Sequence, residues 1–158
     1  MIGNQKLIDT LNALLVLERT GIDQYLIHRA KFNNWQIAGQ IAYFDDRIGE
    51  EREHQAFLED RILFLGGVIV PQVINQVNVG WDVPEIFAFD EQAEITAIAA
   101  YNEAIALAVS VGDEDTADKL RFILSQETDH YNDIVAREDQ MRMSSVQLWV
   151  AVNIRGAA

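Results

Sequence analysis

Two Glu-x-x-His segments bring together residue types that bind metal ions, Glu51 with His54 and Glu127 with His130. Residues three apart lie on the same face of an α-helix, so the carboxylate and the imidazole of each segment can point toward one position. The interval from Glu51 to Glu127 equals the interval from His54 to His130, so the second segment repeats the first at a constant offset. This spacing predicts two equivalent half-sites on two different helices.

The repeat includes a single glutamate one helix earlier in each half. Glu18 and Glu94 are separated by the same offset, so each lies equally far before the Glu-x-x-His segment of its own half. The chain is therefore interpreted as two helical hairpins, each supplying one Glu and one Glu-x-x-His. Four carboxylates and two imidazoles on four helices are typical of a carboxylate-bridged dimetal site in a four-helix bundle. Such ligands accept Fe²⁺, Mn²⁺ or Zn²⁺.

An alternative interpretation is that these residues are ordinary charges on solvated helix faces. Two observations favour the metal site over it. Two of only three histidines lie in the repeat, and Glu18 falls within an apolar stripe that includes Leu11, Leu14 and Ile22. Buried carboxylates are costly unless they are paired or bound to metal, and four of them without a cation would repel one another.

Two tyrosines follow the same repeat. Tyr25 and Tyr101 each lie seven residues after Glu18 and Glu94, respectively, which is about 10 Å along a helix. Direct contact with a metal is therefore not expected for both. Tyr25 is a candidate catalytic residue, as an oxidisable neighbour of the site, and Tyr101 is interpreted as a core aromatic residue.

Length and composition narrow the class of protein. The chain has 158 residues, 49% of them hydrophobic, which predicts one domain over residues 1–158 with a sizeable core. The absence of cysteine excludes disulfides, thiolate metal sites and iron–sulfur clusters. The net charge of −13 argues against nucleic acid or an anionic membrane surface as a partner. Because no segment resembles a signal peptide or a membrane span, a cytoplasmic location is expected.

Hydrophobic periodicity and helix-capping residues predict four long helices and a short fifth one. Asn4 and Asp82 are expected N-caps, and Gly66-Gly67 is expected to end the second helix. The expected helices run over about 4–34, 36–65, 82–111, 113–143 and 146–155. The fifth is apolar and too short to join the bundle, which predicts burial against other copies of the chain.

Residues 68–81 interrupt the helical pattern with Pro71 and several β-branched residues. They predict an extended segment, with a β-strand as the alternative. A segment of this length spans up to about 46–50 Å, enough to travel the length of the bundle. The third helix would then start at the same end as the second. The predicted fold is therefore all-α, a ferritin-like four-helix bundle with one long crossover and a short C-terminal helix.

With these features, the chain resembles the bacterioferritin family over essentially its whole length. The residues that carry the resemblance are Glu18, Tyr25, Trp35, Glu51, His54, the run Arg61 to Leu65, Glu94, Glu127, His130 and Ile154-Arg155. The resemblance implies a ferroxidase that binds two iron ions per subunit and oxidises Fe(II) with O₂ or H₂O₂. It also implies a hollow 24-subunit cage that stores the ferric mineral. In this pattern Glu51 and Glu127 match bridging ligands, and the other four residues match terminal ligands.

The chain departs from the pattern of the family at several positions, among them two on the second helix. Members of the family usually bind haem between two subunits through a methionine of the second helix, and Arg52 occupies that position here. No methionine lies between Met1 and Met141, so haem is not expected in the homomer. Some members bind a further iron on the inner surface at the positions of Asp46 and Glu50; Glu50 retains the carboxylate for such a role.

Two other functions use the same ligand set. One is a di-iron or di-manganese oxidase that stores no iron. The other is a shell subunit that assembles with a haem-binding sister chain. Retention of soluble iron after aerobic addition of Fe²⁺ separates storage from these alternatives.

Overall fold

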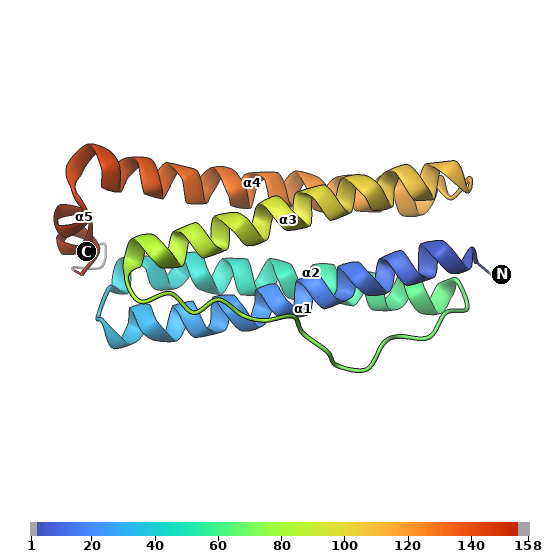
Figure 1. The fold of residues 1–158 in the computed structure, drawn as a ribbon, viewed down its shortest axis with the longest axis horizontal. Helices are drawn as coiled ribbons and strands as arrows, with labels where there is room; N and C mark the ends of the chain where they lie inside the picture. The colour runs from blue at the N-terminus through green and yellow to red at the C-terminus, as the bar shows by residue number, and fades with distance from the viewer. Residues whose placement is uncertain (1–2, 155–158) are drawn as a thin grey trace.

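The computed structural model describes residues 3–154 and is all-α over this range, which confirms the predicted fold class. Four long helices form a bundle, and a short helix crosses one of its ends (Figure 1). The helices are α1 (Gln5–Asn34), α2 (Ile41–Phe64), α3 (Val83–Ser110), α4 (Glu114–Ser144) and α5 (Val146–Ile154), with a 3-10 turn η1 (Ala38–Gln40) before α2. None of the helices within residues 3–154 combines the length and the hydrophobicity needed to cross a membrane.

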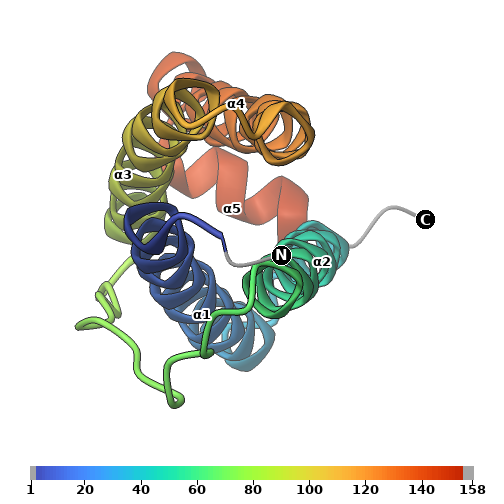
Figure 2. The ribbon, with the colours of Figure 1, turned by 90° about the vertical axis from the view of Figure 1, so that its right-hand side faces the viewer.

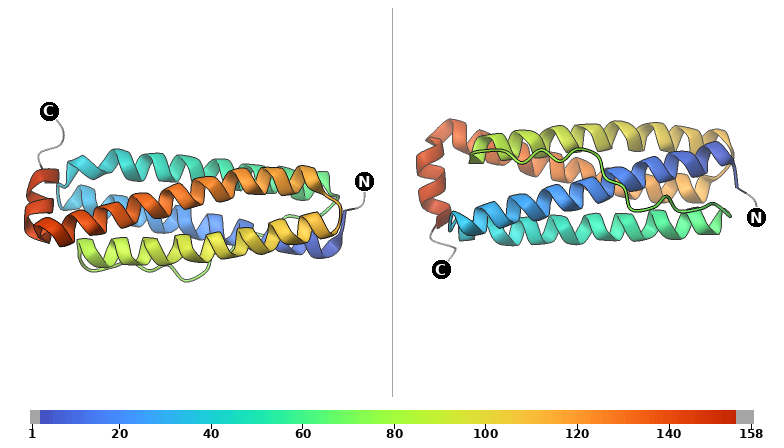
Figure 3. Two further views of the ribbon diagram at one scale, coloured as in Figure 1. Left: turned by 90° about the horizontal axis from the view of Figure 1, so that it is seen from above. Right: turned by 60° about the horizontal axis from the view of Figure 1, so that its bottom comes forward.

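The segment between α2 and α3 runs the length of the bundle. It leaves the end of α2, passes beside α1 and reaches the opposite end of the bundle, where α3 begins (Figure 3). Helix α1 packs mainly on α2, and α3 packs mainly on α4. Viewed along the bundle axis, the four helices surround a common interior that α5 closes at the far end (Figure 2). The predicted long crossover is therefore confirmed.

Polar side chains along α1 hold the crossover in place. Asn12 donates from Nδ2 to the carbonyl oxygen of Val68 at 3.0 Å and accepts from the N–H of Val70 at 2.9 Å. The α1 side chains that bond to the crossover backbone are Asn12, Arg19, Thr20, Gln24, His28 and Lys31. The alternative of a β-strand is wrong, because residues 3–154 contain no strand and these side chains take the place of a ladder partner.

Side-chain caps start three of the helices where the sequence predicts them. Asn4, Asp82 and Asp113 each accept a hydrogen bond from the backbone N–H three residues later, at 3.2, 2.9 and 3.1 Å. Each bond satisfies one of the N–H groups that a helix start leaves without a partner. The starts of α1, α3 and α4 are thus set by local chemistry.

The start of α2 differs from the prediction. Gln36 has a φ of 59°, in the left-handed region, and the buried side chain of Ile37 turns into the core. The chain then passes through η1, and α2 begins at Ile41 rather than near residue 36. At its other end α2 stops at Phe64, and Gly66, with a φ of 76°, supplies the left-handed residue that ends many helices.

Helix α5 is partly packed on its own chain. Trp149 is buried, and its ring meets that of Phe87 edge to face at a centroid distance of 5.7 Å. Leu148, Val152 and Ile154 remain exposed on the same helix. The apolar surface predicted for this helix is therefore only partly covered within the chain. Arg155, expected as its last residue, lies outside the described residues.

Candidate metal centre

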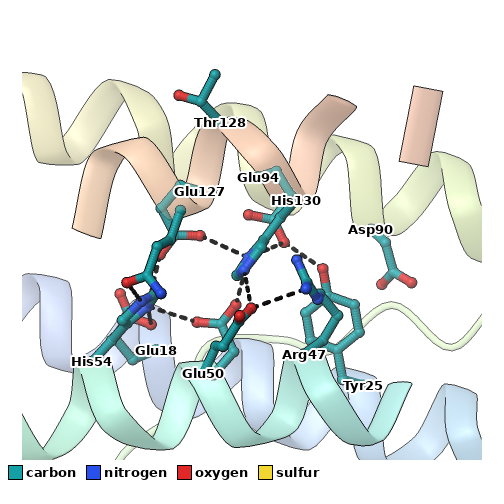
Figure 4. Close-up of polar contacts among 12 residues, drawn as sticks. Glu18, Tyr25, Arg47, Glu50, His54, Asp90, Glu94, Glu127, Thr128 and His130 are labelled. Carbon is teal, nitrogen blue, oxygen red and sulfur yellow. Dashed lines mark hydrogen bonds and ion pairs between the residues drawn. The ribbon is translucent and has the colours of Figure 1, made fainter. Parts of the chain in front are cut away.

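Two apolar clusters fill the bundle, and a buried polar cluster separates them. The larger apolar cluster contains Leu11, Leu58 and Leu120, and the other, rich in aromatic rings, contains Phe44 and Phe87. Between them the bundle buries six residues, none more than 4% exposed: Glu18, Glu51, His54, Glu94, Glu127 and His130. The structure thus brings together all six ligands predicted from the sequence, from four different helices. Figure 4 labels each of them except Glu51.

The six residues form two overlapping groups of four. One group is Glu18, Glu51, His54 and Glu127, and the other is Glu51, Glu94, Glu127 and His130. Each residue of a group offers one ligand atom, and these atoms lie within 4.8 Å of one another. We call the first the His54 half-site and the second the His130 half-site. Glu51 and Glu127 belong to both.

The two shared glutamates have the geometry of bridging ligands. Glu127 places one carboxylate oxygen 3.0 Å from Nδ1 of His54 and the other 3.3 Å from Nδ1 of His130. Glu51 does the same at 3.4 and 3.3 Å. Each carboxylate therefore presents one oxygen to each half-site.

Three atoms that face the interior of the cluster are buried without a hydrogen-bond partner: Nδ1 of His54, Nδ1 of His130 and Oε1 of Glu127. The ion-pair contacts of these atoms are close enough for electrostatic attraction but lack hydrogen-bond geometry. Buried polar atoms are normally satisfied, and an orphaned ring nitrogen facing carboxylates is explained by a cation between them. The donor set, carboxylate oxygen with imidazole nitrogen, fits two divalent transition-metal ions.

The carboxylates of the cluster differ in acidity. Burial, together with the charges of Glu51 and Glu127, raises the pKa values of Glu18 and Glu94 well above the ordinary value. Burial also acts to raise the pKa of Glu51, but a hydrogen bond with Glu18 and the contacts with both histidines outweigh it and lower that pKa. For Glu127, burial and the charge of Glu51 raise the pKa, and the contacts with the two histidines outweigh them and lower it. These shifts favour the protonated form of the terminal glutamates and the ionised form of the shared ones.

Both histidines are more basic than usual. Burial acts to lower the pKa of each imidazole, but contacts with Glu127 and Glu51 outweigh it and raise the pKa of His130 to about 9. The same kind of contacts raises the pKa of His54 even further. Both shifts favour the protonated imidazolium beside the shared carboxylates.

The two tyrosines of the repeat contact the terminal glutamates. The hydroxyl of Tyr25 donates to Glu94, and the hydroxyl of Tyr101 donates to Glu18, so each bond joins one hairpin to the other. Tyr101 is buried in the core as expected, but the interpretation as a core aromatic alone missed this bond. The antiparallel course of α1 and α3 explains the crossed pairing.

The nitrogen of each imidazole that points away from the cluster also has a partner. Nε2 of His130 contacts Glu50 Oε2 at 2.7 Å, and Glu50 forms an ion pair with Arg47 at 3.0 Å. Nε2 of His54 contacts Gln126 Oε1 at 3.1 Å. The sequence analysis did not identify Gln126 or Arg47. The repeat could have indicated Gln126, because Glu50 and Gln126 each directly precede a shared glutamate and are therefore separated by the same offset.

A cavity of about 170 Å³ reaches the cluster from the side of α1 and α3. All four glutamates of the cluster line it, as does Tyr25. Its remaining lining includes uncharged polar residues of the crossover, among them Asn75, Gln76 and Asn78. The crossover thus contributes to the passage between the surface and the carboxylates.

Comparison with known proteins agrees with the fold and the cluster. A family model described as the ferritin-like domain matches residues 8–143. The chain is 31% identical to "Bacterial ferritin" of Synechocystis sp. over 131 residues, 82% of this chain and 84% of the relative. It is 30% identical to "Bacterioferritin" of Streptomyces coelicolor over 155 residues, 98% of this chain and 92% of the relative. The chain belongs to the bacterioferritin family.

A third relative matches over a shorter stretch at higher identity. "Bacterial ferritin" of Paramagnetospirillum magnetotacticum is 35% identical over 108 residues, 67% of this chain and 65% of the relative. The helices that carry the cluster, α1 to α4, all overlap the part of the chain that the family model matches.

Helix α2 carries the residues at which the resemblance implies a departure from the family pattern: Arg52, Asp46 and Glu50. Arg52 is exposed and directed away from the cluster that its neighbour Glu51 enters. Asp46 is also exposed, whereas Glu50, the second residue expected at an inner-surface iron site, already contacts His130 and Arg47. Asp46 and Glu50 are therefore not among the residues that form the two half-sites.

Proposed function

We propose that this bacterioferritin oxidises and stores iron. Two Fe(II) ions bind as substrate, one in each half-site, with Glu51 and Glu127 shared between them. The terminal ligands are Glu18 and His54 for one ion and Glu94 and His130 for the other. Two Fe(II) ions supply two electrons, which with two protons reduce H₂O₂ to two water molecules, or O₂ to H₂O₂.

The observation that carries this proposal is the paired placement of oxygens on the shared glutamates. Glu127 lies 3.0 and 3.3 Å from the two inward-facing histidine nitrogens, and neither nitrogen has a hydrogen-bond partner. Four carboxylates offset the charge of two divalent ions, and their burial keeps the cluster from being a solvated acidic patch. Tyr25, which lines the cavity and bonds to Glu94, is the candidate oxidisable neighbour.

The test is aerobic addition of Fe²⁺ to the purified protein. The wild type should oxidise Fe²⁺ rapidly and keep hundreds of iron atoms per assembly soluble. Glu18→Ala and His130→Ala should lose rapid oxidation while circular dichroism stays helical, because each variant removes one ligand. Glu103→Ala is the matched control, since Glu103 is an exposed glutamate on α3. Wild-type rates in both ligand variants would overturn the assignment.

The same experiment addresses the competing functions. A di-iron or di-manganese oxidase without a storage role would turn over but leave the ferric product to precipitate. Storage of a ferric mineral requires an assembly that encloses it, and we propose that 24 copies of the chain form such a cage. The exposed Leu148, Val152 and Ile154 of α5 supply apolar surface for contacts between copies. A shell shared with a haem-binding sister chain is the alternative, and the size of the homomer by light scattering tests it.

We further propose that the homomer binds no haem. A thioether sulfur from each of two subunits would be needed at the twofold position, and Arg52 offers a guanidinium, which stays protonated and has no lone pair. Protein produced with excess haem should show no Soret band, and Arg52→Met should restore one. A Soret band of bis-methionine character in the unmodified homomer would show that the Arg52 argument is wrong.

A further inference from the structure

The two half-sites are alike in their ligands and different in what holds their histidines. Each imidazole is contacted on its outer nitrogen by the residue that precedes the shared glutamate on the opposite helix. For His130 this residue is Glu50 on α2, at 2.7 Å, and for His54 it is Gln126 on α4, at 3.1 Å. The repeat therefore extends beyond the ligands, but it places a carboxylate in one half and a neutral amide in the other.

The carboxylate is itself fixed. Arg47 forms an ion pair with Glu50 at 3.0 Å, and its side chain is only 12% exposed. Its guanidinium also lies over the Tyr43 ring, 5.8 Å from the centroid. Ile123 occupies the position that corresponds to Arg47 in the other half, since it precedes Glu127 by as much as Arg47 precedes Glu51. The His54 half-site thus has neither the outer carboxylate nor the cation that orients it.

This difference affects the ligand strength of the two imidazoles. A histidine that binds metal through Nδ1 must carry its proton on Nε2 and donate it outward, and a carboxylate acceptor fixes that tautomer and makes the ring a better ligand than an amide does. Hydrogen bonds to charged acceptors are also shorter and stronger, in agreement with 2.7 Å against 3.1 Å.

A further cavity borders the outer side of His54, in addition to the one that reaches the glutamates of both half-sites. A cavity of about 180 Å³ between α2 and α4 is lined by His54 and Gln126 together with the exposed residues Glu53, Lys119 and Phe122. On the other side, Glu50 and Arg47 cover the outer edge of His130. His54 is therefore supported on its outer side by fewer charged contacts than His130.

We infer that Glu50 is a positioning residue for His130 and that the two metal positions differ in affinity as a result. The His130 half-site fills first and releases its ion last, and the His54 half-site is the exchangeable one. Because Glu50 is already engaged by His130 and Arg47, it is not free to serve as a ligand of a separate inner-surface iron. This inference rests on the proposed dimetal function.

The test is anaerobic titration of the metal-free protein with Co²⁺, which reports ligand geometry through its visible absorption and involves no turnover. The wild type should bind two Co²⁺ per chain in two resolved steps. Glu50→Gln should weaken the tighter step by about 10-fold or more, the usual effect of losing an outer partner, and should leave the other step unchanged. Gln126→Glu should strengthen the weaker step. Asp60→Asn is the matched control, since it makes the same charge change at an exposed position of α2.

Two ligand variants assign the steps to the half-sites. His130→Ala should abolish the tighter step, and His54→Ala should abolish the weaker one. Two bound Co²⁺ with unchanged steps in Glu50→Gln, or loss of the tighter step in His54→Ala, would overturn the inference while leaving the dimetal site intact. A wild-type protein that binds fewer than two Co²⁺ would overturn both the proposed function and the inference.

Discussion

The His54 and His130 half-sites differ less in the atoms that face the metal positions than in the residues behind them. Both offer a terminal glutamate, an inward-facing Nδ1 and the same two shared carboxylates. On the outer side, His54 is contacted by the neutral Gln126 and His130 by the charged Glu50. A repeat in the sequence can thus determine which ligands a site contains. The residues that contact those ligands from outside determine how similar the surroundings of its two halves are.

Removing a shared ligand should affect both half-sites at once. Glu51→Gln removes the charge that both half-sites use, so both Co²⁺-binding steps should weaken by more than the roughly 10- to 100-fold typical of outer partners. Glu18→Gln should affect mainly the step assigned to the His54 half-site. The two variants are compared by the same anaerobic titration, and equal effects of Glu51→Gln and Glu18→Gln would contradict a bridging role for Glu51.

The metal-free protein should lose stability as the pH rises. The pKa of His130 is raised from the ordinary 6.5 to about 9, so its contribution to folding is fully present below pH 6.5 and is lost between about pH 6.5 and 9. The expected loss is on the order of a few kcal/mol in the free energy of unfolding. Saturation with Zn²⁺ should flatten this dependence, because the cation replaces the proton. A constant Tm of the metal-free protein over this range would contradict the charge assignment.

A smaller effect is expected from the tyrosines. Tyr25→Phe and Tyr101→Phe each remove a hydroxyl that donates to a terminal glutamate, at a cost of about 1–3 kcal/mol when the acceptor stays buried. The two variants should lower the Tm to a similar extent. Only Tyr25 lines the cavity that reaches the carboxylates, so only Tyr25→Phe should also slow Fe(II) oxidation. Equal slowing by both variants would remove the distinction between the two tyrosines.

Much of the fold follows from local sequence signals. The polar caps Asn4 and Asp82 mark helix starts, and the length and composition of residues 68–81 predict the crossover. The start of α2 was not predictable in this way, because the left-handed Gln36 is not a glycine and its conformation depends on the burial of Ile37. Tertiary packing overrides the local preference there.

The convergence of the six candidate ligands was predictable because they share one spacing in an otherwise varied sequence. The residues that contact these ligands from outside the cluster were harder to predict. Gln126 and Glu50 follow the same spacing, but one is an amide and the other a carboxylate, so the sequence does not suggest that they have the same role. Only the structure shows that each contacts the outer nitrogen of a histidine. The bond from Tyr101 to Glu18 depends on the crossed arrangement of α1 and α3. None of these three contacts is local in sequence.

The dimetal site is tested most directly by anomalous diffraction at the iron edge from crystals loaded anaerobically with Fe²⁺. Two iron peaks per chain are expected inside the bundle, one next to Glu18 and His54 and the other next to Glu94 and His130. Both peaks should lie within coordination distance of Glu51 and Glu127. A single peak, or peaks only at surface carboxylates, would contradict a carboxylate-bridged pair of metal ions.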